Sequence, residues 1–290
     1  MTRKSWGLFL ATGFLWGIPY LFIKIAVDPG GFQPGFLVFA RVSLGAIFLI
    51  PLAVKRGLLQ EAMKYFRWIL LYSIIELVGP WYFLSSGERH VSSGLAGLLI
   101  ATVPFWSTIA ASILGDKTVW QSHRILGMVI GFVGVILVVG LESLRGKNSG
   151  SSIALILLAA LGYAIAPIMI RRKAPTLNGL AINSVAMLIT AIIYIPVGII
   201  QFPHALPNAK SIWSLIILGV FPTAIAFVLF FQVIVSIGPT RASMITYINT
   251  AVAVLLGILV LNEPLTLGIG LGLPLILIGS YLSGKKSSIQ

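Results

Sequence analysis

Apolar stretches long enough to cross a membrane recur along this chain, with only short polar links between them. A helix that spans the hydrocarbon core of a bilayer needs about 20 mostly apolar residues. The sequence therefore predicts an all-α integral membrane protein with ten transmembrane helices. The predicted segments are 5–27, 33–54, 67–87, 91–115, 122–141, 151–171, 178–201, 210–236, 239–261 and 266–283.

The composition excludes a water-soluble fold. Hydrophobic residues make up 58% of the chain and charged residues only 9%, whereas soluble domains are roughly 25% charged. The net charge of +13 comes from basic residues that lie between the apolar segments. That placement is typical of membrane topology signals rather than of a nucleic-acid-binding surface. The chain has no cysteine, so disulfides, zinc–thiolate sites and thiol nucleophiles are excluded.

The distribution of basic residues predicts the orientation in the membrane. Lys and Arg concentrate on the cytoplasmic side of membrane proteins. With the N-terminus inside, fourteen of them fall on the inner face and four on the outer face, so both termini are predicted to be cytoplasmic. The outer residues are Arg89, Arg145, Lys147 and Lys210, and the inner ones are Arg3, Lys4, Lys55, Arg56, Lys64, Arg67, Lys117, Arg124, Arg171, Arg172, Lys173, Arg241, Lys285 and Lys286.

The two halves of the chain carry similar features at a nearly constant offset of roughly 145–148 residues. Five helices is an odd number, so a second copy would enter the membrane from the opposite side. The sequence thus predicts an inverted repeat of 1–145 and 146–290, an arrangement found in alternating-access transporters. The matches are Trp16 with Tyr163, Lys24 with Arg171, Pro51 with Pro196, Trp68 with Trp213, Asp116 with Glu263, and Gly131 with Gly279.

Several local motifs together resemble the EamA-type branch of the drug/metabolite transporter superfamily. They are 15–20 (LWGIPY), 92–104 (SSGLAGLLIATVP), 115–118 (GDKT), 238–247 (GPTRASMITY) and 261–266 (LNEPLT). The resemblance covers nearly the whole chain. It implies a 5+5 inverted repeat, with a cavity lined mainly by the first, third, fourth, sixth, eighth and ninth helices. It also implies that the fifth and tenth helices are peripheral, and that the protein exports amino acids, metabolites or amphiphilic compounds across a bacterial inner membrane.

Two positions depart from the family pattern. Thr250 stands where the second repeat would usually carry a proline, and Asp116 replaces the more typical glutamate of the first repeat. A bend in the ninth helix is therefore less strongly predicted than a bend in the fourth helix, which carries Pro104.

Glu76 and Arg41 are charged residues within predicted helices. A charge at this depth is costly, so each should face a cavity or a partner. Glu76 could couple transport to protons, bind a cationic part of the substrate, or form a structural ion pair with Arg41. The residues leave these alternatives open.

Aromatic and polar side chains of the predicted cavity helices form the candidate substrate site. Tyr and Trp with a few polar groups suit a small amphiphilic or aromatic solute, although such residues also mark the membrane interface or join helices to each other. The predicted substrate-binding residues are Trp16, Tyr72, Glu76, Trp81, Trp106, Tyr163, Tyr247 and Asn249.

Prolines inside apolar helices remove a backbone hydrogen bond and favour kinks. Interrupted helices line the binding site of many transporters. We predict hinges at Pro80, Pro104 and Pro222.

The sequence favours a secondary transporter that exports small metabolites, driven by the substrate gradient or by proton exchange. A passive channel is the alternative, and a lipid-modifying membrane enzyme is a weaker one. The chain has only three His and lacks a Walker A motif, so we expect no catalytic residues, metal or cofactor. The substrate is not evident from the residues, and either a monomer or a homodimer is compatible with them.

Overall fold

The computed structural model describes residues 2–115, 121–144, 150–237 and 245–284, without the side chains of 138–144, 234, 237, 247, 280, 283 and 284. The described residues form helices and turns, with no strand among them. In chain order the helices are α1 (Arg3–Gly17), α2 (Pro19–Ala26), α3 (Pro34–Lys55), α4 (Leu59–Lys64), α5 (Phe66–Tyr72), η1 (Ser73–Val78), α6 (Gly79–Gly87), α7 (Ser93–Ile100), α8 (Val103–Ile113), α9 (Ser122–Leu144), α10 (Gly150–Lys173), α11 (Gly179–Ile200), α12 (Ala209–Leu218), η3 (Gly219–Ile225), α13 (Ala226–Ile237), α15 (Ile245–Leu261) and α16 (Leu267–Gly284).

Seven helical segments of the described chain are long and apolar enough to cross a membrane, and three shorter apolar helices cover 122–137, 248–261 and 267–279. Each of the ten predicted segments overlaps one of these ten. An all-helical integral membrane protein is thus confirmed. The seven longer segments are Arg3–Ala26, Pro34–Lys55, Phe66–Gly87, Ser93–Ile113, Gly150–Lys173, Gly179–Ile200 and Ala209–Val233.

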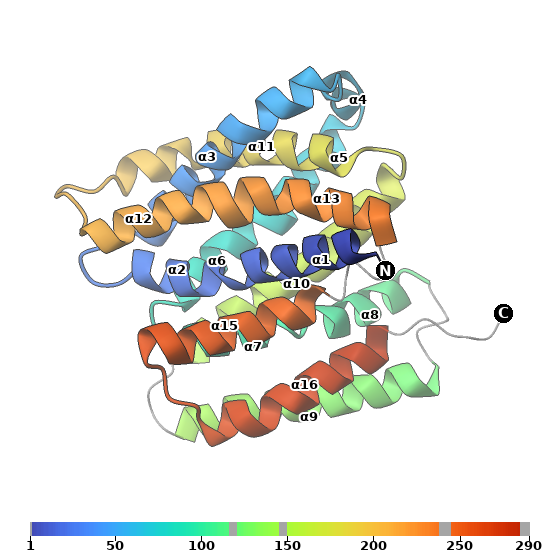
Figure 1. Cartoon of the computed structure of the whole chain (residues 1–290), viewed down its shortest axis with the longest axis vertical. Coiled ribbons are helices and arrows are strands. Elements are labelled where there is room, and N and C mark those ends of the chain that lie inside the picture. Colours follow the sequence, from blue (N-terminus) through green and yellow to red (C-terminus); the bar gives the residue numbers. More distant parts are fainter. Residues whose placement is uncertain (1, 116–120, 145–149, 238–244, 285–290) are drawn as a thin grey trace.

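The helices lie roughly along one direction, with two pairs at opposite edges of the bundle (Figure 1). At one edge α9 packs along α16, the most extensive contact between two helices, and at the other edge α3 packs along α11. The α9–α16 contact is close because a Cβ atom on Gly279 would lie only 2.5 Å from Gly131 Cα. Small residues allow such backbone approach in membranes. The edge position of α9 and α16 agrees with what the family resemblance implied.

Four of the apolar segments are interrupted, and prolines mark each interruption. Pro19 begins α2 after the break at Ile18, and Pro104 lies in the first turn of α8, after the turn at Ala101 and Thr102. Pro80 follows the π-helical segment η1, and Pro222 lies inside the π-helical segment η3. The three predicted hinge prolines therefore sit at real distortions of the backbone.

The ninth apolar segment behaves differently from the fourth. The described part of α15 runs without a break from Ile245 to Leu261. Thr250 lies within it, and its hydroxyl donates a hydrogen bond to Thr246 O at 2.9 Å, as threonine does in an ordinary helix turn. The absence of a proline at position 250 thus agrees with a continuous α15, in contrast to the break between α7 and α8 in the first half of the chain.

Candidate substrate site

Arg41 lies in the middle of α3 with only 7% of its surface exposed. Its Nε donates a hydrogen bond to Thr223 Oγ1 at 2.9 Å. The guanidinium carbon lies 3.8 Å from the centroid of the Trp81 ring, a cation–π distance. These two contacts join α3 to η3 and α6, and they hold a positive charge inside the bundle.

Thr223 is available to Arg41 because Pro222 distorts η3. Pro222 has no N–H to donate to the carbonyl of Leu218, four residues earlier. The Thr223 hydroxyl donates to Leu218 O instead, at 2.7 Å, and its oxygen accepts the bond from Arg41. Trp16 Nε1 donates to the Pro222 carbonyl at 3.2 Å. The distortion therefore presents polar groups of η3 to both α3 and α1.

Glu76 belongs to the π-helical segment η1. Its Oε2 atom is buried and has no hydrogen-bond partner among the described residues. Within that part of the chain, no ion pair joins Glu76 to Arg41, which is held by Thr223 and Trp81 instead. The structural ion pair considered from the sequence is therefore not formed, and the carboxyl group retains an oxygen free for a proton or a solute.

Two tyrosines lie within electrostatic range of Glu76, namely Tyr72 of α5 and Tyr163 of α10. The Tyr72 hydroxyl donates to Asn183 Oδ1 of α11 at 3.2 Å. Tyr163 also lies within electrostatic range of Arg41. We refer to the following residues as the Arg41–Glu76 site: Arg41, Tyr72, Glu76, Trp81, Tyr163 and Thr223.

Trp16 borders this site but its polar atom is already used. Besides the bond to Pro222, its ring packs edge-on against Phe227, with centroids 5.5 Å apart, and in a tilted arrangement against Phe230, with centroids 4.5 Å apart. The aromatic cluster fastens α1 to α13. The Trp16 N–H is therefore already bonded within the protein.

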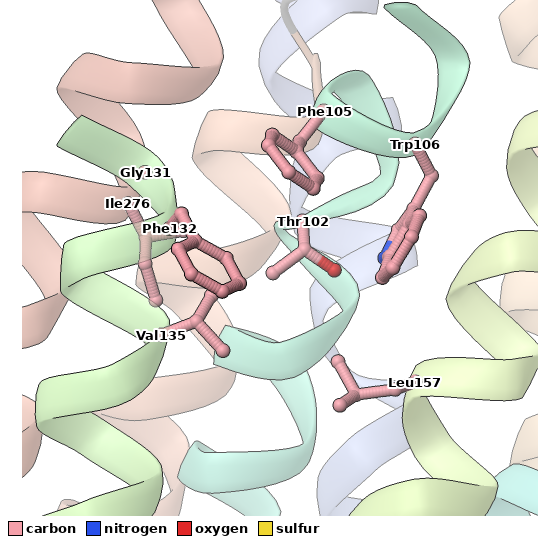
Figure 2. Close-up of a pocket in the computed structure, with 8 residues that line it drawn as sticks. All are labelled: Thr102, Phe105, Trp106, Gly131, Phe132, Val135, Leu157 and Ile276. Carbon is pink, nitrogen blue, oxygen red and sulfur yellow. The ribbon is translucent and has the colours of Figure 1, made fainter. Parts of the chain in front are cut away.

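Trp106 lies elsewhere, in a separate apolar pocket between α8 and the outer helices (Figure 2). Asn249 of α15 is buried, and its Oδ1 accepts a hydrogen bond from Thr250 Oγ1 at 3.3 Å. The side chain of Tyr247 lies outside the described residues.

A second group of charges lies at the ends of α2 and α6. Lys24 Nζ donates to the carbonyl oxygens of Glu88 and Val91, at 2.7 and 2.9 Å. Glu263 accepts from Ser93 N and Gly94 N at 2.7 and 3.0 Å, so its carboxylate caps the first turn of α7. A negative charge is stabilising at a helix N-terminus.

Glu88 is the most unusual of these residues. It lies just past the end of the apolar segment 66–87 and is fully buried, and both its carboxyl oxygens have no hydrogen-bond partner among the described residues. Burial raises the pKa of the Glu88 carboxyl well above its ordinary value, with a further increase from Glu263, while Lys24 and Arg41 act in the opposite direction. Burial thus favours the protonated, uncharged form of the Glu88 carboxyl.

Comparison with known families identifies this architecture. The model of the EamA-like transporter family matches residues 4–140 and again 150–284. The chain belongs to the EamA-like transporter family. This EamA-family protein is therefore a membrane transporter of the drug/metabolite transporter superfamily, and it acts on small-molecule substrates in a lipid bilayer.

Relatives of this EamA protein are named as transporters. It is 26% identical to the uncharacterized transporter YoaV of Bacillus subtilis, over 98% of this chain and 97% of that protein. It is 25% identical to the uncharacterized inner membrane transporter YedA of Escherichia coli, over 97% and 92%. A chain of known crystal structure superposes with a TM-score of 0.68 at 16% identity, over 98% of both chains, which shows a shared fold.

In this EamA-family transporter the predicted site residues separate into groups. Trp81 packs on Arg41, Tyr72 lies within electrostatic range of Glu76, and Tyr163 lies within range of both Glu76 and Arg41. Trp16 binds the Pro222 carbonyl beside Thr223, and Trp106 lines the other pocket. The sequence predicted neither Thr223 as a site residue nor the burial of Glu88, and Arg41 was expected to face a cavity or a partner but was not among the predicted substrate-binding residues. Thr223 follows a proline within an apolar helix, and that pattern is a usable signal, because a hydroxyl there can replace the missing N–H. Glu88 stands beside Arg89 and His90 in a polar link, and nothing in that composition indicates burial.

Proposed function

We propose that this EamA-family protein is a secondary exporter of small metabolites, such as amino acids or amphiphilic and aromatic compounds. In this proposal the solute binds at the Arg41–Glu76 site and crosses by alternating access. The observation that carries the proposal is the buried Glu76 oxygen in a π-helical segment, which no other described residue binds, because ionisable groups within membrane segments mark substrate or proton pathways.

The proposed mechanism uses the arrangement of charges. Arg41 is fixed by Thr223 and Trp81, so a solute carboxylate would meet a positioned cation. Glu76 would accept either a proton or the ammonium group of the same solute. Trp81 and the flanking tyrosines would contact the apolar part. A zwitterion or an amphiphilic aromatic compound would fit these contacts to Arg41, to Glu76 and to the aromatic side chains.

Alternating access would come from two inverted repeats, 1–145 and 146–290, in a ten-helix bundle. The two family matches, 4–140 and 150–284, support this division. So does the spacing of the π-helical segments, since η1 begins at Ser73 and η3 at Gly219. This offset falls within the range of the sequence matches. Each distortion contributes a residue to the Arg41–Glu76 site, Glu76 from η1 and Thr223 from η3. A change of helix geometry there would open the site to one side of the membrane and close it to the other.

Contacts between links support the proposed topology, with both termini in the cytoplasm of a bacterial cell and the protein in its inner membrane. Asn208 N donates to Gly30 O, which joins two links assigned to the outer face. Arg172 donates to Leu114 O, which joins two helix ends assigned to the inner face. In addition, α1 begins and α16 ends at the same end of the bundle (Figure 1), as an even number of crossings requires.

Counterflow in proteoliposomes tests the proposal against the passive-channel alternative. Liposomes that contain the purified protein are preloaded with one unlabelled amino acid or organic cation, and uptake of a trace amount of the labelled compound is followed. A carrier predicts transient accumulation above equilibrium and saturation with concentration. Uptake that merely equilibrates and rises linearly with concentration would instead indicate a channel.

A further inference from the structure

The pocket beside Trp106 is separate from the Arg41–Glu76 site. It has a volume of about 180 Å³ and lies between α8, α9, α10 and α16, so the outer α9–α16 pair forms one of its walls (Figure 2). No residue of the Arg41–Glu76 site lines it. The lining residues are Thr102, Phe105, Trp106, Gly131, Phe132, Val135, Leu157 and Ile276.

The break between α7 and α8 forms part of this pocket. Thr102 lies at the turn, and its hydroxyl donates to Leu99 O at 2.6 Å, so its oxygen can only accept a further hydrogen bond. The break comes just before Pro104, which cannot continue the hydrogen bonding of α7. In the other half, α15 continues through Thr250 without a break, so the distortion at this pocket is particular to the first half.

Trp106 brings an unused hydrogen-bond donor to the pocket. Its Nε1 is buried and has no acceptor among the described residues. In Figure 2 the ring nitrogen lies on the edge of the indole that faces Thr102 across the cavity. A buried N–H without an acceptor is unfavourable. The site therefore calls for a ligand atom that accepts one hydrogen bond.

The other walls are apolar and largely aromatic. Phe105 packs edge-on against Trp106, with centroids 5.3 Å apart, and stacks with Phe132 at 6.3 Å. One water molecule could satisfy Trp106 and Thr102, but it takes up only about 30 Å³. An apolar cavity of about 150 Å³ holds a benzene molecule. The volume of this pocket thus matches one six-membered ring with a short substituent.

The pocket also adjoins the lipid-facing surface. Phe132 lines it and is 54% exposed, next to other exposed apolar residues of α9 such as Val129 and Ile136. An uncharged ligand could enter sideways from the hydrocarbon, without passing the Arg41–Glu76 site. None of the lining side chains is charged, so a charged ligand would lose its hydration with no compensating partner.

We propose that the Trp106 pocket is a second binding site, which takes a neutral monocyclic aromatic compound whose substituent accepts a hydrogen bond from Trp106 Nε1. This inference does not depend on the transport mechanism, because it concerns binding at a place apart from the proposed substrate site.

Indole N–H resonances provide a direct test, since the chain has seven tryptophans. Protein labelled with ¹⁵N-tryptophan, in detergent micelles, is titrated with acetophenone and separately with α-methylstyrene. The second probe has the same shape but carries a CH₂ group in place of the carbonyl oxygen. Trp106→Phe identifies the Trp106 signal. Acetophenone should move this signal downfield in a saturable way, as a new hydrogen bond requires, and α-methylstyrene should not.

Two substitutions on α10 provide the matched comparison. Leu157→Phe fills the pocket and should abolish the acetophenone effect, whereas Leu158→Phe, on the exposed side of the same helix, should leave it unchanged. If Leu157→Phe does not fold, Val135→Phe fills the same pocket from α9. A Trp106 signal that does not move, that moves equally with both probes, or that still responds when the pocket is filled would overturn the proposal.

Discussion

Glu88 is buried, its two carboxyl oxygens have no hydrogen-bond partner within the described part of the chain, and it lies within electrostatic range of charged groups of several elements. These groups are Lys24, Arg41 and Glu263. Because burial raises the pKa of Glu88 in the folded protein, the folded state binds a proton that the unfolded chain releases above its ordinary pKa of about 4.5. Stability from this group is therefore complete in acid and is lost as the pH rises towards the elevated pKa.

We expect Glu88→Gln to remove this pH dependence. The wild-type free energy of unfolding should fall as the pH rises above about 4.5 towards the raised pKa of Glu88, by at most about 1.4 kcal/mol per pH unit for a single proton, and the variant should show a flatter profile. The measurement is thermal unfolding of purified protein in detergent over a range of pH. Glu61→Gln, on the short helix α4, is the matched control. Parallel profiles for wild type and Glu88→Gln would contradict the assignment.

The interior position of some charged residues could be predicted from the sequence, but their contacts could not, for a physical reason. Arg41 and Glu76 were predictable as interior charges, because a charge within an apolar run needs a special environment. Their partners were not predictable. The contact between Arg41 and Thr223 joins residues 182 positions apart, and it depends on how Pro222 distorts η3. Glu88 was missed because its burial depends on tertiary packing near Lys24, Arg41 and Glu263, which the polar composition of its link does not reveal.

Elements interrupted by proline are the parts of the bundle most suited to change shape. The sequence predicted Pro80, Pro104 and Pro222 as hinges, and each lies at a distortion. It could not predict that two of the distortions would be π-helical, because proline removes a hydrogen bond without specifying how the helix rearranges.

We expect Pro222→Ala and Pro80→Ala to slow transport. Alanine restores the N–H group and favours a regular α-helix, which would stabilise one conformation over the other. A bias of about 1.4 kcal/mol would slow turnover roughly tenfold. The initial rate of counterflow measures this, with Pro51→Ala as the control, since Pro51 lies within the unbroken helix α3. Equal effects of all three substitutions would contradict a hinge role.

For the whole molecule, ten apolar segments, an all-helical fold and membrane class followed from hydropathy alone. Hydropathy did not predict which helices pack against each other, because apolar helix faces match many neighbours equally well in lipid. The family resemblance supplied the edge position of α9 and α16, which Figure 1 shows. The pairing of α3 with α11 at the opposite edge emerged only from the structure.

The proposed inverted topology can be tested by labelling single introduced cysteines, because the chain has no cysteine of its own. Single cysteines at the exposed residues Asp28 and Ala205 should react with a membrane-impermeant maleimide in intact bacterial cells. Cysteines at the exposed residues Arg56 and Thr176 should react only after the membrane is opened. Labelling of Thr176→Cys in intact cells would contradict the proposed second repeat, while labelling at position 56 would contradict the first.

The central claim is that solute crosses at the Arg41–Glu76 site, and the most direct test is the pH dependence of counterflow in wild type, Glu76→Gln and the control Glu61→Gln. We predict that wild type and Glu61→Gln respond alike to pH, whereas Glu76→Gln folds normally and loses that response, because its amide cannot exchange a proton. A correctly folded Glu76→Gln protein with an unchanged pH profile and unchanged substrate affinity would contradict the account.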